Sequence, residues 1–261
     1  MNLPAELAAC AGLVETSDPD RFAATMAAPP DARARLWPLY ALNLELARAP
    51  YASPEPLVAE MRLQWWIDQI AALGTGGVGQ GDVAAALVAL LDHQPDVAPL
   101  LSVMAEARRW ECWTDPFGDE TAFATYLDHT AGNLMWAAAL ALGAPPAAET
   151  PVRAFAYAAG LANWLAAVPD LTARGRHPLC DGHPAAIAAL ARGGLAAIAC
   201  ARRKSALVPA ACHPALWPGW SARARLKEAA RHPERVALGL TEPTRLHRSL
   251  CLIQRGITRR W

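Results

Sequence analysis

The sequence lacks an unbroken run of 18 apolar residues, although 54% of its 261 residues are hydrophobic. The nearest approach, residues 154–168, contains Asn163 and is followed by Pro169 and Asp170, which we expect to end it. A helix that spans a bilayer needs about 20 predominantly apolar residues. We therefore interpret this segment as a buried core helix and expect a soluble protein.

β-Branched residues are scarce, and no segment alternates polar and apolar residues in the way a half-buried strand does. Alanine is abundant, and it favours helix because it loses no side-chain entropy there. Asp18-Pro19 and Thr150-Pro151 are typical helix starts. We predict helices over residues 19–26, 32–49, 54–73, 82–91, 95–113, 121–142, 151–168, 183–204, 221–231 and 241–259. The sequence thus predicts an all-α bundle in one domain, residues 1–261, with residues 1–17 as a candidate flexible segment.

The six cysteines form no C-x-x-C motif, and the first twenty residues lack the basic region and apolar run of a signal peptide. We therefore expect free thiols and a cytoplasmic location. His177, Cys180 and His183 have a spacing that could bring three ligands to one metal. No fourth ligand follows nearby, so an ordinary loop is the preferred interpretation and a metal-binding module the weaker alternative. The glycine-rich residues 74–81 lack the Gly-Lys-Ser/Thr ending of a phosphate loop and predict a solvent loop.

Acidic residues are nearly absent from the last seventy positions. Fourteen arginines and lysines stand there against Glu228, Glu234 and Glu242, a local excess of about +11 in a chain of zero net charge. Either the two parts of the chain neutralise each other, or this part meets an anionic partner such as a phosphate, a membrane or an acidic protein. The ending Arg259-Arg260-Trp261 motivates a peripheral position at the inner membrane. We expect no nucleic-acid partner.

Three stretches together resemble the squalene/phytoene synthase family. They are residues 33–70, with RARLWPLYALNLELAR and EPLVAEMRLQWWIDQI, residues 126–144, YLDHTAGNLMWAAALALGA, and residues 160–179, GLANWLAAVPDLTARGRHPL. The resemblance implies a single bundle of the isoprenoid-synthase type. It also implies head-to-head joining of two prenyl diphosphates, with Mg²⁺ held between two aspartate-rich motifs on facing helices.

Both aspartate-rich motifs are missing from this sequence. Alignment on Tyr40 places Ala47 and Tyr51 at the first carboxylate pair, and alignment on residues 163 and 174–176 places Ala167 and Leu171 at the second. Because Mg²⁺ requires hard oxygen ligands, we predict no catalytic residues, no metal ligands and no cofactor. Magnesium belongs only to the alternative, an active head-to-head prenyl diphosphate synthase.

The remaining pattern looks more like a degenerate branch of the family, which includes a mitochondrial complex I assembly factor. The resemblance then implies a pseudoenzyme that binds a prenyl lipid or a protein partner, with a role in respiratory-complex assembly. Polar and aromatic side chains that would line the old groove are its candidate ligand contacts. They are Tyr40, Asn43, Arg62, Trp65, Tyr126, Asn163, Arg174 and Arg176.

Overall fold

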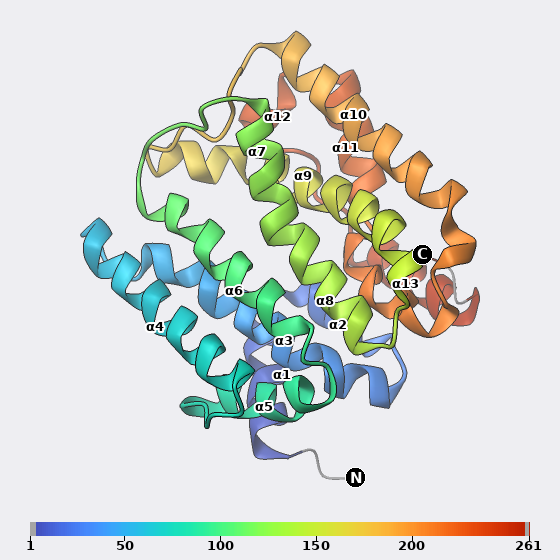
Figure 1. Ribbon diagram of the computed structural model, residues 1–261. Helices are drawn as coiled ribbons and strands as arrows, with labels where there is room; N and C mark the ends of the chain where they lie inside the picture. The colour runs from blue at the N-terminus through green and yellow to red at the C-terminus, as the bar shows by residue number, and fades with distance from the viewer. Residues whose placement is uncertain (1–3, 259–260) are drawn as a thin grey trace.

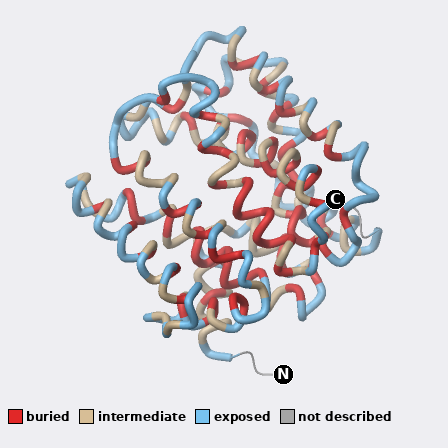
Figure 2. Tube along the Cα trace, in the orientation of Figure 1, coloured by how far each residue is buried: buried red, intermediate tan, exposed pale blue. Residues whose placement is uncertain are grey.

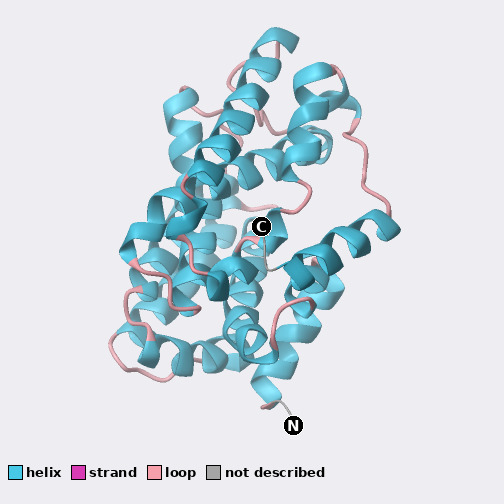
Figure 3. Ribbon diagram, turned by 90° about the vertical axis from the view of Figure 1, so that its right-hand side faces the viewer, coloured by secondary structure: helices cyan, strands magenta, loops and turns pink. Residues whose placement is uncertain are grey.

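The computed structural model describes residues 4–258 and 261, and within these residues it contains helices and no strand (Figures 1 and 3). The all-α prediction is confirmed. The helices are α1 Ala5–Ser17, α2 Pro19–Met26, α3 Pro30–Arg48, α4 Pro56–Gly74, α5 Gly81–His93, α6 Val97–Ala107, α7 Glu120–Leu127, α8 Asn133–Ala141, α9 Glu149–Ala173, α10 Pro184–Arg203, α11 Ala222–Arg231, α12 Arg235–Leu238 and α13 Arg245–Thr258.

The bundle is built outward from α3, α8 and α9. Leu36, Leu39, Leu42 and Leu46 of α3 are fully buried, because their spacing of three and four residues keeps them on one face. Helices α1, α5 and α8 pack on α3, while α10 and α11 pack on α9. Figure 1 shows α4 and α5 toward one side and α10 and α11 toward the other, and Figure 2 shows the buried residues concentrated between them.

Residues 5–17, part of the segment offered as a candidate flexible one, form helix α1. Helix α1 packs against α3 and α5, with Cys10 and Val14 fully buried. The sequence does not reveal that α1 packs on the bundle, because small residues occupy most of the helix and leave no clear amphipathic stripe. Residues 1–3 lie outside the described part of the chain.

Helix α9 continues to Ala173, so the expectation that Pro169 ends it is wrong. A proline inside a helix removes one backbone hydrogen bond, but tertiary packing can offset that loss. Val168 is buried at this point of the helix. The extra turn brings Leu171 onto the same helix as Asn163 and Ala167, which matters for the cavity described below.

Helix α10 is long and apolar enough, by length and composition, to cross a membrane. About a third of its apolar stretch is buried inside the protein. Residues 184–203, and not residues 154–168, are therefore the helix that meets the length and composition of a membrane span among the described residues. Ile187, Ala191 and Ile198 face α9 and α11 and are buried. Gly194 permits this packing, because an added Cβ would lie 2.9 Å from Leu226 and 3.0 Å from Leu161. Helix α10 is thus partly buried, with one side packed on α9 and α11.

A single rod predicted over residues 121–142 is observed as α7, a π-helical turn at Asp128–Gly132, and α8. The turn lies against α9 where Gly160 leaves room: a Cβ there would come within 2.6 Å of the Ala131 Cβ. Such π-turns are frequent at functional sites because they redirect side chains. Here the turn places Thr130 and Ala131 on the wall of a cavity.

A central cavity with a buried polar network

A cavity of about 390 Å³ lies among α3, the π-helical turn, α8 and α9. The backbones of residues 108–112 and 215–219 close parts of its wall. Its size lies in the usual range for small-molecule sites, roughly 300–1,000 Å³. Apolar side chains predominate, with polar groups gathered near residues 108–111.

The four positions that should carry the metal-binding carboxylates all line this cavity. Ala47 and Tyr51 lie on the side formed by α3 and the turn that follows it, and Ala167 and Leu171 lie on α9. Neither alanine, leucine nor tyrosine offers the anionic oxygen that Mg²⁺ requires. The four positions that the resemblance aligns with the carboxylate motifs are therefore all cavity-lining positions.

An ion pair stands at the polar side of the cavity. The Arg108 guanidinium lies 2.7 Å from a Glu111 carboxylate oxygen and donates a second hydrogen bond to the Asn43 amide oxygen at 3.0 Å. The Tyr126 hydroxyl donates to the same Glu111 oxygen at 2.7 Å. These bonds join α3, the segment after α6, and α7 around one buried carboxylate.

The pKa shifts of Arg108 and Tyr126 show which groups of this network carry charge. Burial alone would lower the pKa of Arg108, but the Glu111 carboxylate outweighs it and raises the pKa above its ordinary value. Burial, reinforced by Glu111, raises the pKa of Tyr126 well above its ordinary value. Arg108 therefore stays charged and Tyr126 stays neutral, so the network is a closed structural unit.

Magnesium does not fit the residues of this cavity. Among the described lining residues Glu111 is the only acid, and it is already bound to Arg108 and Tyr126. Over residues 4–258 and 261, no three His, Cys, Asp or Glu side chains are grouped so that they could hold a metal ion. His177, Cys180 and His183 consequently form no such group, and the structure gives the metal-binding alternative no support.

Tyr40 presents a hydroxyl without a partner. The side chain lines the cavity and is only 2% exposed, and no described residue hydrogen-bonds to its oxygen. Burial raises its pKa, which keeps the hydroxyl neutral and able to donate. A buried polar group without a partner is costly, so this hydroxyl could meet an oxygen atom of a bound molecule.

Tyr51 lies beneath two guanidinium groups. Arg174 stands 4.7 Å and Arg176 5.6 Å from the centre of its ring, within the range of cation–π contacts. Arg176 also donates to the backbone carbonyls of Glu111 and Trp113, so it braces the cavity wall. Arg174 has no such backbone anchor and is the more exposed of the two arginines.

Aromatic rings pack beside the network. Trp110 stacks on Phe117 at 3.8 Å, and Tyr126 meets Trp164 edge-on at 5.2 Å. Tyr126 and Trp164 also line the cavity. These rings give the cavity a rigid apolar border.

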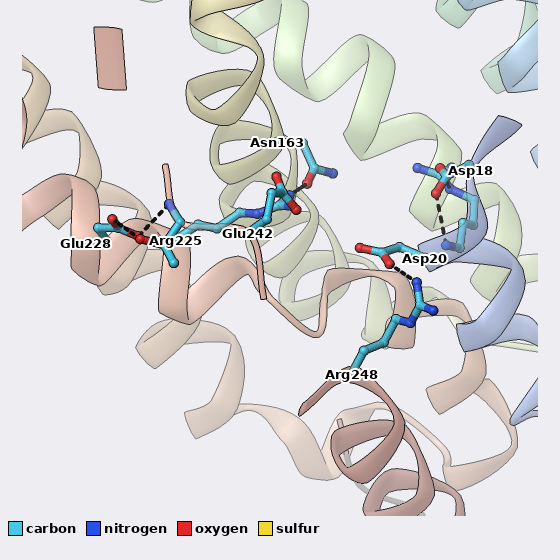
Figure 4. A network of polar contacts seen from close by, with 9 residues as sticks. Asp18, Asp20, Asn163, Arg225, Glu228, Glu242 and Arg248 are labelled. Carbon is cyan, nitrogen blue, oxygen red and sulfur yellow. Dashed lines mark hydrogen bonds and ion pairs between the residues drawn. The ribbon is translucent and has the colours of Figure 1, made fainter. Parts of the chain in front are cut away.

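A polar cleft of about 830 Å³ adjoins the cavity and shares Arg21, Asn163 and Ala167 with it. Figure 4 shows its two groups of contacts. Arg225 bonds Asn163 at 2.8 Å and Glu242 at 3.2 Å, and Arg248 pairs with Asp20. The cleft is consequently lined by paired polar groups, and the Arg248–Asp20 ion pair joins α13 to α2 from the other end of the chain.

The eight predicted contact residues fall into three groups. Tyr40, Asn43, Tyr126 and Asn163 line the cavity, and Arg174 and Arg176 contact Tyr51 at its wall. The structure does not bring the other two to the cavity. Arg62 lies on the outer side of α4 and pairs with Glu45 at 3.6 Å, and Trp65 is 40% exposed with its ring against Trp66.

Sequence reasoning missed Arg108 and Glu111, which form the charged centre of the site. Their spacing of three residues is the one available signal, because it puts both on one side of a helical turn. Surface pairs have the same spacing, as Glu106 and Arg109 show one turn away. Only the tertiary contacts with Asn43 and Tyr126 distinguish the buried pair.

The model of the squalene/phytoene synthase family matches residues 14–181. Among solved structures, a dehydrosqualene synthase with a bound ligand is similar, with a TM-score of 0.76 and 16% identity over 97% of this chain and 95% of that one. The squalene synthase HpnC from Alicyclobacillus acidocaldarius is also similar, with a TM-score of 0.75 and 14% identity over 88% and 94%. At these identities the likeness establishes the isoprenoid-synthase-like fold alone. A search of curated proteins gave no match.

Proposed function

We propose that this chain, which belongs to the squalene/phytoene synthase family, binds a prenyl lipid in its central cavity without transferring a prenyl group. The observation that carries the proposal is the cavity wall. Ala47, Tyr51, Ala167 and Leu171 occupy the four carboxylate positions, and all four line the cavity. The fold keeps a ligand-sized space while the side chains that would seat the metal are absent from it.

Loss of prenyl transfer follows from the electrostatics of the reaction. A diphosphate leaves an allylic carbon only if its developing negative charge is stabilised, and bound metal ions supply that charge in this family. The Glu111 carboxylate cannot replace the missing ligands, because Arg108 neutralises it at 2.7 Å. Glu111 is the one acid among the described residues of the cavity wall, and it is already paired with Arg108.

Binding of an apolar chain follows from what remains. Leu134, Met135 and Trp164 contribute apolar surface, and the unpartnered Tyr40 hydroxyl offers one hydrogen bond. A lipid with a neutral oxygen at its end, such as a prenyl alcohol, matches both features. Burial of its chain against these residues would drive binding through the hydrophobic effect.

The first experiment incubates the purified protein with farnesyl or geranylgeranyl diphosphate and Mg²⁺. We expect no release of diphosphate above a protein-free control. Catalytic release of diphosphate with formation of a joined prenyl product would establish the active synthase and refute the proposal.

The second experiment titrates geranylgeraniol and follows tryptophan fluorescence and binding heat. Ala167→Phe should weaken binding by at least tenfold, because the ring would occupy the cavity. Ala189→Phe, on the exposed side of α10, is the matched control and should bind as the parent does. If the parent binds no prenyl lipid, the remaining prediction is a protein partner, as in respiratory-complex assembly.

A further inference from the structure

The C-terminal helix α13 turns its apolar side toward solvent. Leu246, Leu250, Ile253 and Ile257 are 70, 58, 57 and 78% exposed. Their spacing of four, three and four residues puts them on one face of the helix. Four large aliphatic side chains therefore form one continuous exposed stripe over the length of α13.

The opposite side of α13 carries charged groups into the protein. Arg248 pairs with Asp20 of α2 (Figure 4), and Arg255 approaches the Trp220 carbonyl at 3.5 Å. Burial lowers the pKa of Arg255 to about 10. Leu252 is the one residue of α13 that is buried outright among those the structure describes. The helix is thus inverted relative to an ordinary surface helix, which buries its apolar side.

Surplus positive charge lies at the start of α13 and where α10 ends. Arg245 is exposed at the start of α13, and Arg202, Arg203 and Lys204 are exposed where α10 ends. Arg202 is close enough to Arg255 to lower its pKa further, so the end of α10 lies near the last turns of α13, on the inner side where Arg255 meets the Trp220 carbonyl. The neighbouring acids do not offset the surplus charge, because Glu242 pairs with Arg225 and Glu228 with Arg235.

We propose that α13 docks the protein on the surface of an anionic lipid bilayer. The helix would lie in the plane of the interface with Leu246, Leu250, Ile253 and Ile257 among the acyl chains. Arg245 and the basic group at residues 202–204 would contact lipid phosphates. Peripheral helices combine an apolar face with flanking cations in this way.

A second copy of the chain fits this surface less well than a bilayer does. A two-fold contact through α13 would bring Arg245 and the basic residues 202–204 of one copy near basic residues of the other. Like charges brought together oppose association. A layer of anionic phosphates instead complements the charge, while its acyl chains cover the apolar stripe.

The test is flotation of the full-length protein with vesicles at low salt. Vesicles of phosphatidylcholine with about a third phosphatidylglycerol should carry the parent upward, and vesicles of phosphatidylcholine alone should not. Leu250→Glu with Ile253→Glu should lower the bound fraction at least tenfold. Both positions are exposed, so circular dichroism should show unchanged helix content and a similar melting temperature.

The matched control places the same change on another exposed apolar surface. Leu57 and Met61 of α4 are 66 and 71% exposed, and Leu57→Glu with Met61→Glu should bind vesicles as the parent does. Replacing Arg202, Arg203 and Lys204 by Gln should weaken binding by roughly fivefold per charge removed, and high salt should abolish that difference.

Three results would overturn the proposal. The parent would fail to float with anionic vesicles, the α4 variant would lose binding as much as the α13 variant, or the α13 variant would bind normally. A dimeric parent that becomes monomeric on Leu250→Glu, with no vesicle binding, would assign α13 to a protein interface. The assay uses no prenyl ligand, so its outcome is independent of the proposed cavity function.

Discussion

Removing Arg108 should destabilise the protein far more than removing the arginine beside it. Arg108→Leu deletes the cation that pairs with Glu111, whose side chain is 9% exposed, and removes the Arg108 hydrogen bond to Asn43. The leucine can fill much of the vacated space, so the main effect is a buried carboxylate without a countercharge. Breaking a buried pair in this way typically costs about 3–5 kcal/mol.

The lower end of that range is the better expectation here. Glu111 keeps the hydrogen bond from Tyr126 at 2.7 Å, and the adjacent cavity could admit water to its carboxylate. A loss of about 3 kcal/mol corresponds to roughly 6 °C in melting temperature for a domain of this size. Thermal unfolding followed at 222 nm measures it.

Arg109 provides the matched control. It pairs with Glu106 at 2.6 Å, but the two side chains are 28 and 51% exposed. An exposed pair of this kind contributes about 0–1 kcal/mol, so Arg109→Leu should shift the melting temperature by about 2 °C or less. Equal shifts in the two variants would refute the buried-pair argument.

A double variant separates charge from packing. Arg108→Leu with Glu111→Leu removes both charges together, and replacement of a whole buried pair by apolar residues is often tolerated. The double variant should therefore recover part of the stability that Arg108→Leu loses. Recovery will be incomplete because the Tyr126 hydroxyl then lacks its acceptor. A double variant less stable than both single variants would contradict the reasoning.

Two further predictions concern ionisable groups outside the network. Arg255→Met should raise the melting temperature at pH 7. In the folded protein the pKa of the Arg255 guanidinium, about 10, lies below its unfolded value. Keeping this group charged therefore costs folding stability below pH 10. That advantage over the parent should shrink as the pH rises above 10, which paired melts at pH 7 and 11 would show; the reverse trend would contradict it. Burial raises the pKa of Cys112 to about 11, so about one thiol in a thousand is ionised at pH 8. Mass spectrometry after brief alkylation should therefore find Cys180, which is exposed, labelled before Cys112; equal labelling of the native protein would be the contrary result.

The sequence predicts a helix start correctly where one residue's own side chain caps the helix. Asp18 accepts a hydrogen bond from the Arg21 backbone at 2.9 Å and begins α2 as Asp18-Pro19 predicts. The free state of all six cysteines was also predicted and is confirmed. The passage of α9 through Pro169 was not readable, because packing of Val168 against other helices overrides the local cost of the proline.

The cavity was readable only in part. Tyr40, Asn43, Tyr126 and Asn163 lie on helices whose order the family resemblance supplied, and they do line it. The sequence pattern of α4 does not reveal which of the adjacent Trp65 and Trp66 turns inward. Trp66 is 4% exposed and Trp65 is 40% exposed. The two side chains lie about 100° apart around the α4 axis, so only one of them can face the core.

The changes around the cavity are consistent with one another. Removing carboxylates from a site that binds Mg²⁺ leaves little to attract the metal, and a diphosphate without metal would bring uncompensated negative charge into a buried space. Arg174 and Arg176, the cations nearest the altered positions, contact the Tyr51 ring, and Arg176 is held further by two backbone carbonyls. Arg108 is neutralised by Glu111. Arg108 thus has an acidic partner, whereas the buried Tyr40 hydroxyl has no hydrogen-bond partner among the described residues. The neutral hydrocarbon with an oxygen at its end that we propose would supply a partner for the Tyr40 hydroxyl.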